Sequence, residues 1–184
     1  KQMSMHDDIK TVLVSEEQLK AKVAELGAQI SRDYAGKNLV LVSILKGSVV
    51  FMADLMRAVS IPCNIDFMVV SSYGGSNTTT SGLVKIIKDL DGDLSGKDVL
   101  IVEDIIDSGR TLSYLIKILE DRHPNSIRLC TLLDKPERRV KKDVNVDYCC
   151  FNIPDEFVVG YGLDYAQKYR NLPFIGVVEF DGEE

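Results

Sequence analysis

Two apolar runs of strand length constrain the fold of this chain more than any other feature. Residues 39–44 read LVLVSI and residues 98–103 read DVLIVE, without the polar alternation of a strand that has one face in water. Such strands are typical of a parallel sheet whose two faces are both covered. The runs therefore predict a sheet in the middle of the molecule, with helices packed on it.

Helix signals alternate with strand signals along the chain. The pattern SEEQ at residues 15–18 is a capping box, and the helix that it opens carries an apolar stripe from Leu19 to Ile30. Residues 48–59 predict a helix that is mostly apolar all round and hence deeply packed, and residues 111–121 predict a third helix. Further strands are predicted at residues 65–71, 83–87, 127–133, 146–151 and 174–180. The alternation indicates an α/β fold with a mainly parallel, twisted sheet flanked by helices.

The length of 184 residues suits one domain with a substantial core. We expect this core to span about residues 9–150. The N-terminal segment and about residues 151–184 are expected to form a small hood over one edge. Residues 71–82, SSYGGSNTTTSG, are small and polar, and they predict a mobile loop.

Charge and cysteine content argue against several classes of function. Acidic residues outnumber basic ones by 28 to 22, which gives a formal net charge of −6, whereas proteins that bind nucleic acid are usually basic. No apolar run approaches the ~20 residues that span a bilayer, and the first eight residues lack the apolar stretch of a signal peptide. The four cysteines form no C-x-x-C pattern and predict buried, reduced thiols in the cytoplasm. We expect neither a membrane nor a nucleic acid as partner.

The most informative segment is residues 99–111, VLIVEDIIDSGRT. We expect a strand that ends in two carboxylates, Glu103 and Asp104, and a short loop that opens a helix. Helix N-terminal N–H groups with nearby hydroxyls and a glycine form a cradle for phosphate. Acids beside an anion need partners of their own, which ribose hydroxyls and a divalent cation supply. An acidic turn that only complements the helix dipole is the simpler alternative, but it does not explain the acids, hydroxyls and glycine together.

This segment resembles the phosphoribosyl pyrophosphate (PRPP) signature of type I phosphoribosyltransferases. Further motifs match the purine branch of that family, the hypoxanthine (hypoxanthine-guanine) phosphoribosyltransferases, in the family's order. They are LKGS at 45–48, SSYG at 71–74, LLDKPERR at 132–139 and FVVGYGLDYAQKYRNLP at 157–173. The resemblance covers nearly the whole chain. It implies the type I fold and a purine salvage reaction, in which hypoxanthine or guanine displaces pyrophosphate from PRPP to give IMP or GMP.

The resemblance assigns the PRPP site to the segment after the buried strand. Glu103 and Asp104 match the residues at the ribose hydroxyls and at the Mg²⁺ that accompanies PRPP. Asp107 matches the catalytic residue that accepts a proton from purine N7. The 5′-phosphate loop matches Ser108, Gly109, Arg110 and Thr111. Some family members carry Thr where this chain has Ser108, and since both present a hydroxyl we expect phosphate binding to be kept. The Arg110 side chain is expected to point away from the loop.

Pyrophosphate and purine are assigned to other parts of the chain. The pyrophosphate contacts match Lys46, Gly47 and Arg170. Lys135 matches the donor to purine O6, which would select 6-oxo purines over adenine; a solvated lysine in a basic run is the simpler alternative. Further purine contacts match Ile106, Phe157, Val158 and Asp164, with Phe157 stacked on the ring and Asp164 also a ligand of a second Mg²⁺. Ser72 and Tyr73 match a lid over the reaction centre.

Two other functions suit the same fold. A regulatory RNA-binding protein would need a basic face, for which residues 138–142, RRVKK, are the only candidate. A nucleotide-binding module without catalysis would need neither Asp107 nor the pyrophosphate loop. Dinucleotide and P-loop sites are excluded, because neither G-x-G-x-x-G nor G-x-x-x-x-G-K-[ST] occurs. Apolar faces on the early helices predict a homodimer or homotetramer, as in the family.

Overall fold

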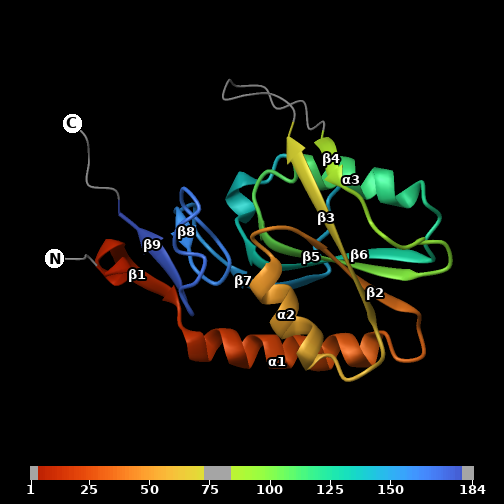
Figure 1. Ribbon diagram of the computed structural model, residues 1–184, viewed down its shortest axis with the longest axis horizontal. Coiled ribbons are helices and arrows are strands. Elements are labelled where there is room, and N and C mark those ends of the chain that lie inside the picture. Colours follow the sequence, from red (N-terminus) through yellow and green to blue (C-terminus); the bar gives the residue numbers. More distant parts are fainter. Residues whose placement is uncertain (1–3, 73–83, 180–184) are drawn as a thin grey trace.

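The computed structural model describes residues 4–72 and 84–179. In chain order its elements are η1 (Met5–Asp8), β1 (Ile9–Val14), α1 (Glu16–Asp33), β2 (Leu39–Ile44), α2 (Val49–Ala58), β3 (Asn64–Ser72), β4 (Val84–Lys88), β5 (Asp98–Ile106), α3 (Arg110–Glu120), β6 (Ser126–Asp134), η2 (Pro136–Arg138), β7 (Tyr148–Asn152), β8 (Val158–Val159) and β9 (Ile175–Val178). Figure 1 shows that they form two sheets, a large one flanked by helices and a small one beside β7.

The large sheet has the strand order β4-β3-β2-β5-β6-β7. The neighbours from β3 to β7 run parallel, and only β4 is antiparallel to its neighbour β3. The predicted α/β fold with a mainly parallel sheet is therefore confirmed. None of the helices in the described part of the chain is long and apolar enough to cross a membrane.

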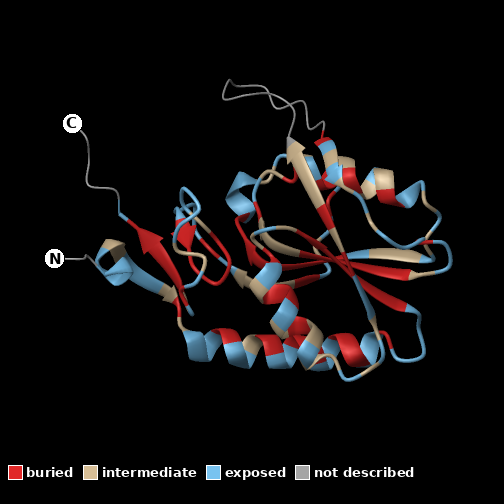
Figure 2. Cartoon of the chain, viewed as in Figure 1, coloured by how far each residue is buried: buried red, intermediate tan, exposed pale blue. Residues whose placement is uncertain are grey.

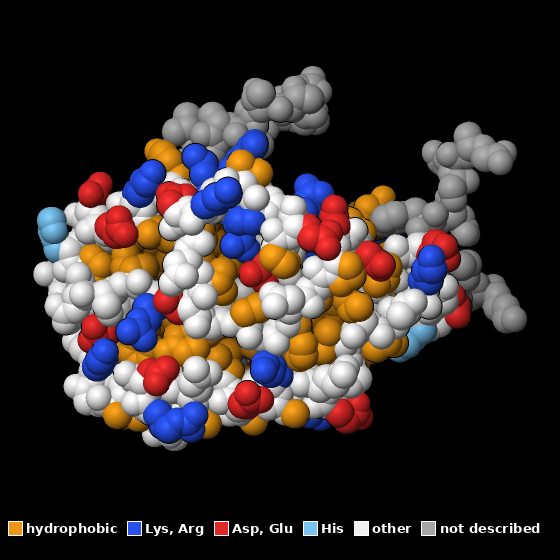
Figure 3. Space-filling view, turned by 180° about the vertical axis from the view of Figure 1, so that it is seen from behind, with side chains coloured by type: hydrophobic (Ala, Val, Ile, Leu, Met, Phe, Trp, Pro, Cys, Tyr) orange, Lys and Arg blue, Asp and Glu red, His pale blue; other side chains and the backbone are white. Residues whose placement is uncertain are grey.

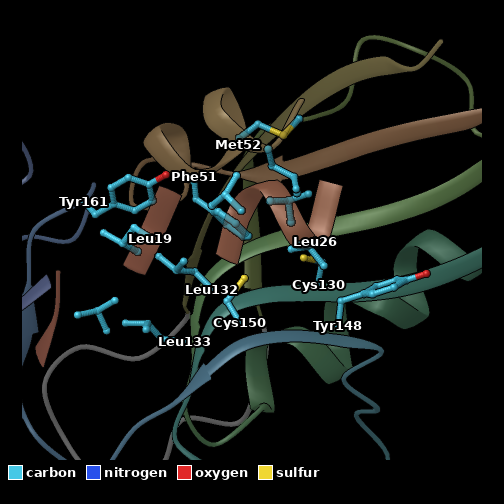
Figure 4. Packing of buried hydrophobic residues seen from close by; sticks show 14 of the residues in the cluster. Leu19, Leu26, Phe51, Met52, Cys130, Leu132, Leu133, Tyr148, Cys150 and Tyr161 are labelled. Carbon is cyan, nitrogen blue, oxygen red and sulfur yellow. The ribbon is translucent and has the colours of Figure 1, made fainter. Parts of the chain in front are cut away.

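The strands of the large sheet bury both faces, as their apolar runs predict. Leu41, Leu100 and Leu132 pack in one cluster with α1 and α2, whereas their neighbours Val42 and Ile101 pack in another with α3. Successive residues of a strand point to opposite faces, so the two clusters lie on opposite sides of the sheet. Figure 2 shows the resulting buried centre, and Figure 4 shows α1 and α2 residues against those of β6 and β7.

Two sequence predictions about these elements are wrong. Helix α2 is not packed all round: Phe51 and Leu55 are fully buried, whereas Val49 is 44% exposed. The helix lies on the surface of the sheet, and only one of its sides meets α1 and β2. Strand β5 does not end at the first carboxylate but continues to Ile106, because β6 pairs with it as far as Asp134. Glu103 and Asp104 are consequently held by the sheet itself.

The small sheet joins the two ends of the described chain in the order β1-β9-β8, with antiparallel pairs throughout. Neither β1 nor β8 was predicted from the sequence; β1 is largely exposed, and β8 has only two residues. Strand β9 is buried along its length. Gly176 allows β1 to approach it, because a Cβ there would lie 2.7 Å from Ile9 Cγ2.

Candidate active site

A pocket of about 280 Å³ opens at the carboxyl ends of β2 and β5, the edge of a parallel sheet where α/β proteins bind ligands. Most of its wall is one continuous segment, which we call the strand–helix turn (residues 103–111). The lining residues are Ile44, Leu45, Gly47, Glu103, Asp104, Ile105, Ile106, Asp107, Ser108, Gly109, Arg110, Thr111 and Leu112. The segment singled out in the sequence therefore surrounds this pocket.

The residue at the N-cap of α3 provides no side-chain cap. It is Gly109, with a left-handed φ of +79°, and it has no side chain that could accept from the first N–H groups of the helix. The Arg110 N–H lies 3.4 Å from Ser108 Oγ, a long hydrogen bond. Uncapped N–H groups that face a pocket attract an anion, because the helix dipole places positive potential there.

Two carboxylates, those of Glu103 and Asp104, line the same pocket. Burial and the neighbouring Asp104 carboxylate raise the pKa of Glu103 well above its ordinary value. Burial likewise raises the pKa of Asp104, although the Ile105 N–H, 2.7 Å from Asp104 Oδ1, opposes this. Adjacent acids withdrawn from water are costly to ionise. A cation or a set of hydroxyl donors brought by a ligand would stabilise their charged forms.

A second loop, after β2, closes the pocket from the other side. Gly47 lies against the Asp104 carboxylate so closely that a Cβ at this position would overlap Asp104 Oδ2. The peptide bond between Leu45 and Lys46 is cis. Lys46 itself is exposed and is not among the residues that line the pocket.

The turn that follows β8 packs against this loop and contains Arg170. Its guanidinium donates to the Gly162 carbonyl at 2.7 Å and pairs with Asp164 at 3.3 Å. Its positive charge also lowers the pKa of Asp104, against the larger effect of burial. Gly162, with φ +98°, packs directly against the Gly47 carbonyl. Arg170 and Asp164 therefore lie beside the pocket, although neither lines it.

Asp107 belongs both to the pocket wall and to a group of charges that we call the charge ring (Asp107, Lys135, Arg138 and Asp155). The Lys135 ammonium lies 3.8 Å from Asp107 and 3.7 Å from Asp155. The Arg138 guanidinium lies 3.8 Å from Asp107 and 3.2 Å from Asp155. Each acid thus has both bases within ion-pair distance, and opposite charges alternate around the ring.

Lys135 is not a solvated lysine in a basic run, because only 8% of the residue is exposed. Its backbone N–H donates to the Ile106 carbonyl at 3.0 Å, which fixes it beside the end of β5. Buried lysines are rare unless a partner compensates the charge, and here the two acids of the charge ring do so. Arg139 holds the same loop by pairing with Asp134 and by donating to the Asp107 carbonyl at 3.2 Å.

An exposed aromatic pair lies on the loops around β8. Phe157 is 48% exposed and Tyr165 43% exposed, and their rings meet edge to face with centroids 5.6 Å apart. Val158, by contrast, points into the main core. Since Asp155 of the charge ring lies two residues before Phe157, the aromatic side chain is near the charges in sequence. Large exposed aromatic rings offer a face on which a planar ligand can stack.

The predicted site residues thus fall into groups. The strand–helix turn and Gly47 meet in the pocket, Lys135 meets Asp107 in the charge ring, and Arg170 meets Asp164. Ile106 lines the pocket but is only 1% exposed. The predicted lid stays a prediction. Tyr73 lies outside the described residues, and Ser72 is described only as the last residue of β3.

Three residues next to the predicted ones, Arg138, Arg139 and Asp155, were not predicted from the sequence. The two arginines were visible as part of the basic run 138–142, but that pattern suggested a candidate surface for RNA. In the structure both arginines turn toward acids of the site. The pairing of Arg138 with Asp155 could not be predicted, because the two residues are far apart along the chain.

The donor set of the pocket fits a divalent cation that arrives with a ligand. Within residues 4–72 and 84–179, no three His, Cys, Asp or Glu side chains form a group that could hold a metal ion unaided. The two adjacent carboxylates, Glu103 and Asp104, supply only part of a coordination shell. Mg²⁺ is commonly bound by one or two carboxylates together with phosphate oxygens of a substrate, which this arrangement suits.

Comparison with known proteins is consistent with this geometry. The model of the phosphoribosyl transferase domain matches residues 13–166. A hypoxanthine-guanine phosphoribosyltransferase of Streptococcus mutans is 55% identical over 177 residues, which cover 96% of this chain and 97% of the relative. The crystal structure of a hypoxanthine phosphoribosyltransferase from Staphylococcus aureus superposes with a TM-score of 0.92 at 51% identity and covers 97% of both chains. A hypoxanthine-guanine phosphoribosyltransferase from Bacillus anthracis, solved with HEPES in its active site, gives a TM-score of 0.87 at 51% identity, covering 94% of this chain and 99% of that one.

Proposed function

The chain belongs to the phosphoribosyltransferase family, and from this premise we propose how its residues divide the reaction. It is a purine salvage enzyme that transfers the 5-phosphoribosyl group from PRPP to hypoxanthine or guanine, giving IMP or GMP and pyrophosphate. One geometric observation carries the assignment of residues: Asp107 lies both in the pocket wall and in the charge ring. The sugar phosphate therefore belongs in the pocket, and the purine belongs above Asp107, toward Lys135.

The strand–helix turn holds the ribose 5-phosphate. The N–H groups at the start of α3 and the hydroxyls of Ser108 and Thr111 donate to the phosphate, with Gly109 allowing close approach. Glu103 and Asp104 accept hydrogen bonds from the ribose hydroxyls. These contacts fix the sugar carbon that reacts, so that both partners are held in line for displacement.

Bond formation occurs at the anomeric carbon. The lone pair of purine N9 forms the new C–N bond while pyrophosphate leaves with the electrons of the old C–O bond, through an oxocarbenium-like state. As N9 attacks, the N7–H proton becomes more acidic, and the Asp107 carboxylate accepts it. The Lys135 ammonium donates to purine O6, which favours 6-oxo purines because the 6-amino group of adenine is itself a donor.

The remaining predicted residues surround these reacting groups. Phe157 stacks on the purine, Val158 contacts the base edge through its backbone, and Ile106 covers the other face of the ring. Lys46, Gly47 and Arg170 bind the pyrophosphate. A planar guanidinium such as that of Arg170 suits two phosphate oxygens. Ser72 and Tyr73 belong to a lid that closes over the reaction centre and excludes water.

Glu103 and Asp104 would hold the Mg²⁺ that accompanies PRPP, and Asp164 would be available to a second ion. Bound there, the metal would neutralise charge on the leaving pyrophosphate. The raised pKa values of Glu103 and Asp104 support this assignment, since a cation would stabilise both carboxylates.

The experiment that tests this function is a spectrophotometric assay with PRPP and each of four bases. We expect turnover with hypoxanthine and guanine, and little with adenine. Side-by-side kcat/KM values for hypoxanthine, guanine and xanthine would establish their ranking. Turnover with adenine equal to that with hypoxanthine would contradict the role of Lys135, and absence of turnover with every base would contradict the function.

The site also favours catalysis over binding of RNA. Arg138 and Arg139 are committed to acids within the charge ring and β6, so the basic run 138–142 does not form a free basic face. The face of the molecule in Figure 3 carries basic and acidic side chains interspersed. Filter binding at physiological salt is expected to show no retention of RNA.

The proposal extends to the hood, the cellular compartment and the oligomeric state of the enzyme. The small sheet of β1, β8 and β9, with the loops around β8, forms the hood over the core. The four cysteines are free, which suits the reducing cytoplasm. Exposed apolar side chains such as Val49 on α2 support a homodimer or homotetramer, which sedimentation of the purified protein would test.

A further inference from the structure

The charge ring contains two residues, Arg138 and Asp155, to which the proposed reaction gives no part. We propose that Asp155 is a positioning residue: it holds the Lys135 ammonium away from Asp107, so that both of these charges remain available to the purine. The inference rests on the proposed roles of Asp107 and Lys135. Asp155 itself is not placed against the substrate.

The distances within the ring support this role. The Lys135 ammonium lies 3.8 Å from Asp107 and 3.7 Å from Asp155, almost equally far from the two carboxylates. Both distances exceed the usual range of a hydrogen bond with these carboxylates. The ammonium is attracted by both acids and committed to neither, which leaves its N–H donors free to turn toward an incoming carbonyl oxygen.

Because Lys135 is buried, its position relative to the two acids depends strongly on their charges. The Lys135 side chain is 10% exposed, so little water competes for its charge. If the Asp155 charge were removed, Asp107 would be the only acid of the ring left beside the ammonium, and direct pairing at about 2.8 Å would follow. Such a pair would withdraw the donor from purine O6, and it would occupy the carboxylate that accepts the N7 proton.

Arg138 keeps Asp155 in place. Its guanidinium donates to both Asp155 oxygens, at 3.2 and 3.5 Å, and connects η2 to the loop before β8. These two side chains are 52% and 46% exposed, and thus form the outer side of the ring, whereas Lys135 lies on the inner side. An exposed ion pair contributes little to the free energy of unfolding. Its position therefore suggests a function in orienting the inner charges.

The test is a double-mutant cycle between Asp155 and Lys135. We expect Asp155→Asn to raise the KM for hypoxanthine about fivefold, near the lower end of the coupling between residues in contact, with the KM for PRPP unchanged. Asp155→Glu, which keeps the charge, is expected to recover most of the loss. In a Lys135→Ala background, Asp155→Asn is expected to have no further effect on the hypoxanthine KM.

Asp89→Asn is the matched control. Asp89 is also half-exposed and also pairs with an arginine, Arg122, at 2.7 and 2.9 Å, but neither residue lines the pocket or belongs to the charge ring. It is expected to leave both KM values unchanged, and the Tm of every variant is measured to check folding.

The outcomes separate this inference from the proposed function. If Lys135→Ala itself leaves the purine KM unchanged, the proposed role of Lys135 fails. If Lys135→Ala acts as expected but Asp155→Asn behaves like the parent enzyme, the inference about Asp155 is overturned. Equal effects of Asp155→Asn with and without Lys135 would show that Asp155 acts on the fold of the loop rather than on the ammonium, which also overturns it.

Discussion

The strand–helix turn and the charge ring solve two binding problems in different ways. The turn is one continuous segment of residues 103–111, held between β5 and α3. The ring is assembled from Asp107, Lys135, Arg138 and Asp155, which come from three separate stretches of the chain. The first therefore depends on local backbone geometry, and the second depends on how distant loops pack together.

The two regions also handle charge differently. In the strand–helix turn, Glu103 and Asp104 lie side by side, and burial raises the pKa of both. In the ring, every acid faces two bases. Carboxylates without basic partners favour a ligand that brings a cation, whereas a site whose acidic and basic charges cancel suits a neutral, planar ligand such as a purine. Mutations in the two regions should therefore separate the kinetics of PRPP from those of the purine.

The largest effect is expected at Asp107, where the two regions meet. Asp107→Ala should lower kcat by about 10²–10⁴-fold, the usual contribution of a general base, because no carboxylate remains to accept the N7 proton. PRPP binding should stay measurable, since Glu103 and Asp104 are intact. Steady-state kinetics and equilibrium binding of PRPP check the two halves of this prediction. An unchanged kcat would show that the proton goes elsewhere.

Substitution of Gly47, which lies against Asp104, should affect the kinetics of PRPP and not the binding of the purine. Gly47→Ala places a Cβ where Asp104 Oδ2 now lies, so the carboxylate must move. Displacement of a positioning group by about 1 Å can cost on the order of 10²-fold in rate, and we expect kcat/KM for PRPP to fall by about ten- to a hundredfold.

Gly92→Ala is the control for this change. A Cβ at Gly92 meets only Asp66 Oδ2, at 3.6 Å, an ordinary contact away from the pocket. It should leave the kinetics intact. If both alanine variants behaved alike, the close fit between Gly47 and Asp104 would have no part in PRPP binding.

The same contrast explains what could be predicted from the sequence. The strand–helix turn was recognisable because its acids, hydroxyl and glycine are neighbours in the chain and form a known motif. The burial of Lys135 could not be predicted, because its neighbours in the sequence are basic and polar. Only the approach of Asp107 and Asp155 in the fold offsets the cost of burying its ammonium.

Fold prediction had the same limit. Strand β2 could be predicted to its ends, since all its residues are buried. Strands β1 and β8 could not, because their stability comes from pairing with β9 rather than from their own apolar pattern. The cis peptide before Lys46 likewise leaves no mark in the sequence of this chain.

Lys135→Ala should affect the purine side alone. A hydrogen bond from a charged donor contributes about 1.5–3 kcal/mol, so the KM for hypoxanthine should rise by about tenfold or more, or discrimination against adenine should weaken. The KM for PRPP should stay within about twofold, because Lys135 does not line the pocket. Kinetics with hypoxanthine and adenine at saturating PRPP measure this. No change in either quantity would contradict contact between the ammonium and purine O6.

The smallest kinetic effect is expected at Phe157. Here purine binding and the free energy of unfolding can be measured on the same variant. Phe157→Ala removes a ring that is already 48% exposed. Base–aromatic stacking contributes about 1–3 kcal/mol, and because this ring is open to water we expect the low end, about a fivefold rise in the purine KM. The free energy of unfolding should change by less than about 0.5 kcal/mol, as for most surface substitutions.

Phe51→Ala provides the opposite case. Phe51 is fully buried between α2 and the sheet, so its truncation should destabilise the fold by about 3–5 kcal/mol. Any protein that still folds should keep its purine KM. Urea unfolding and hypoxanthine kinetics on both variants test the pair. If Phe157→Ala destabilised the protein as Phe51→Ala does while the purine KM stayed constant, Phe157 would be a structural residue of the loops around β8, and the purine would have to stack elsewhere.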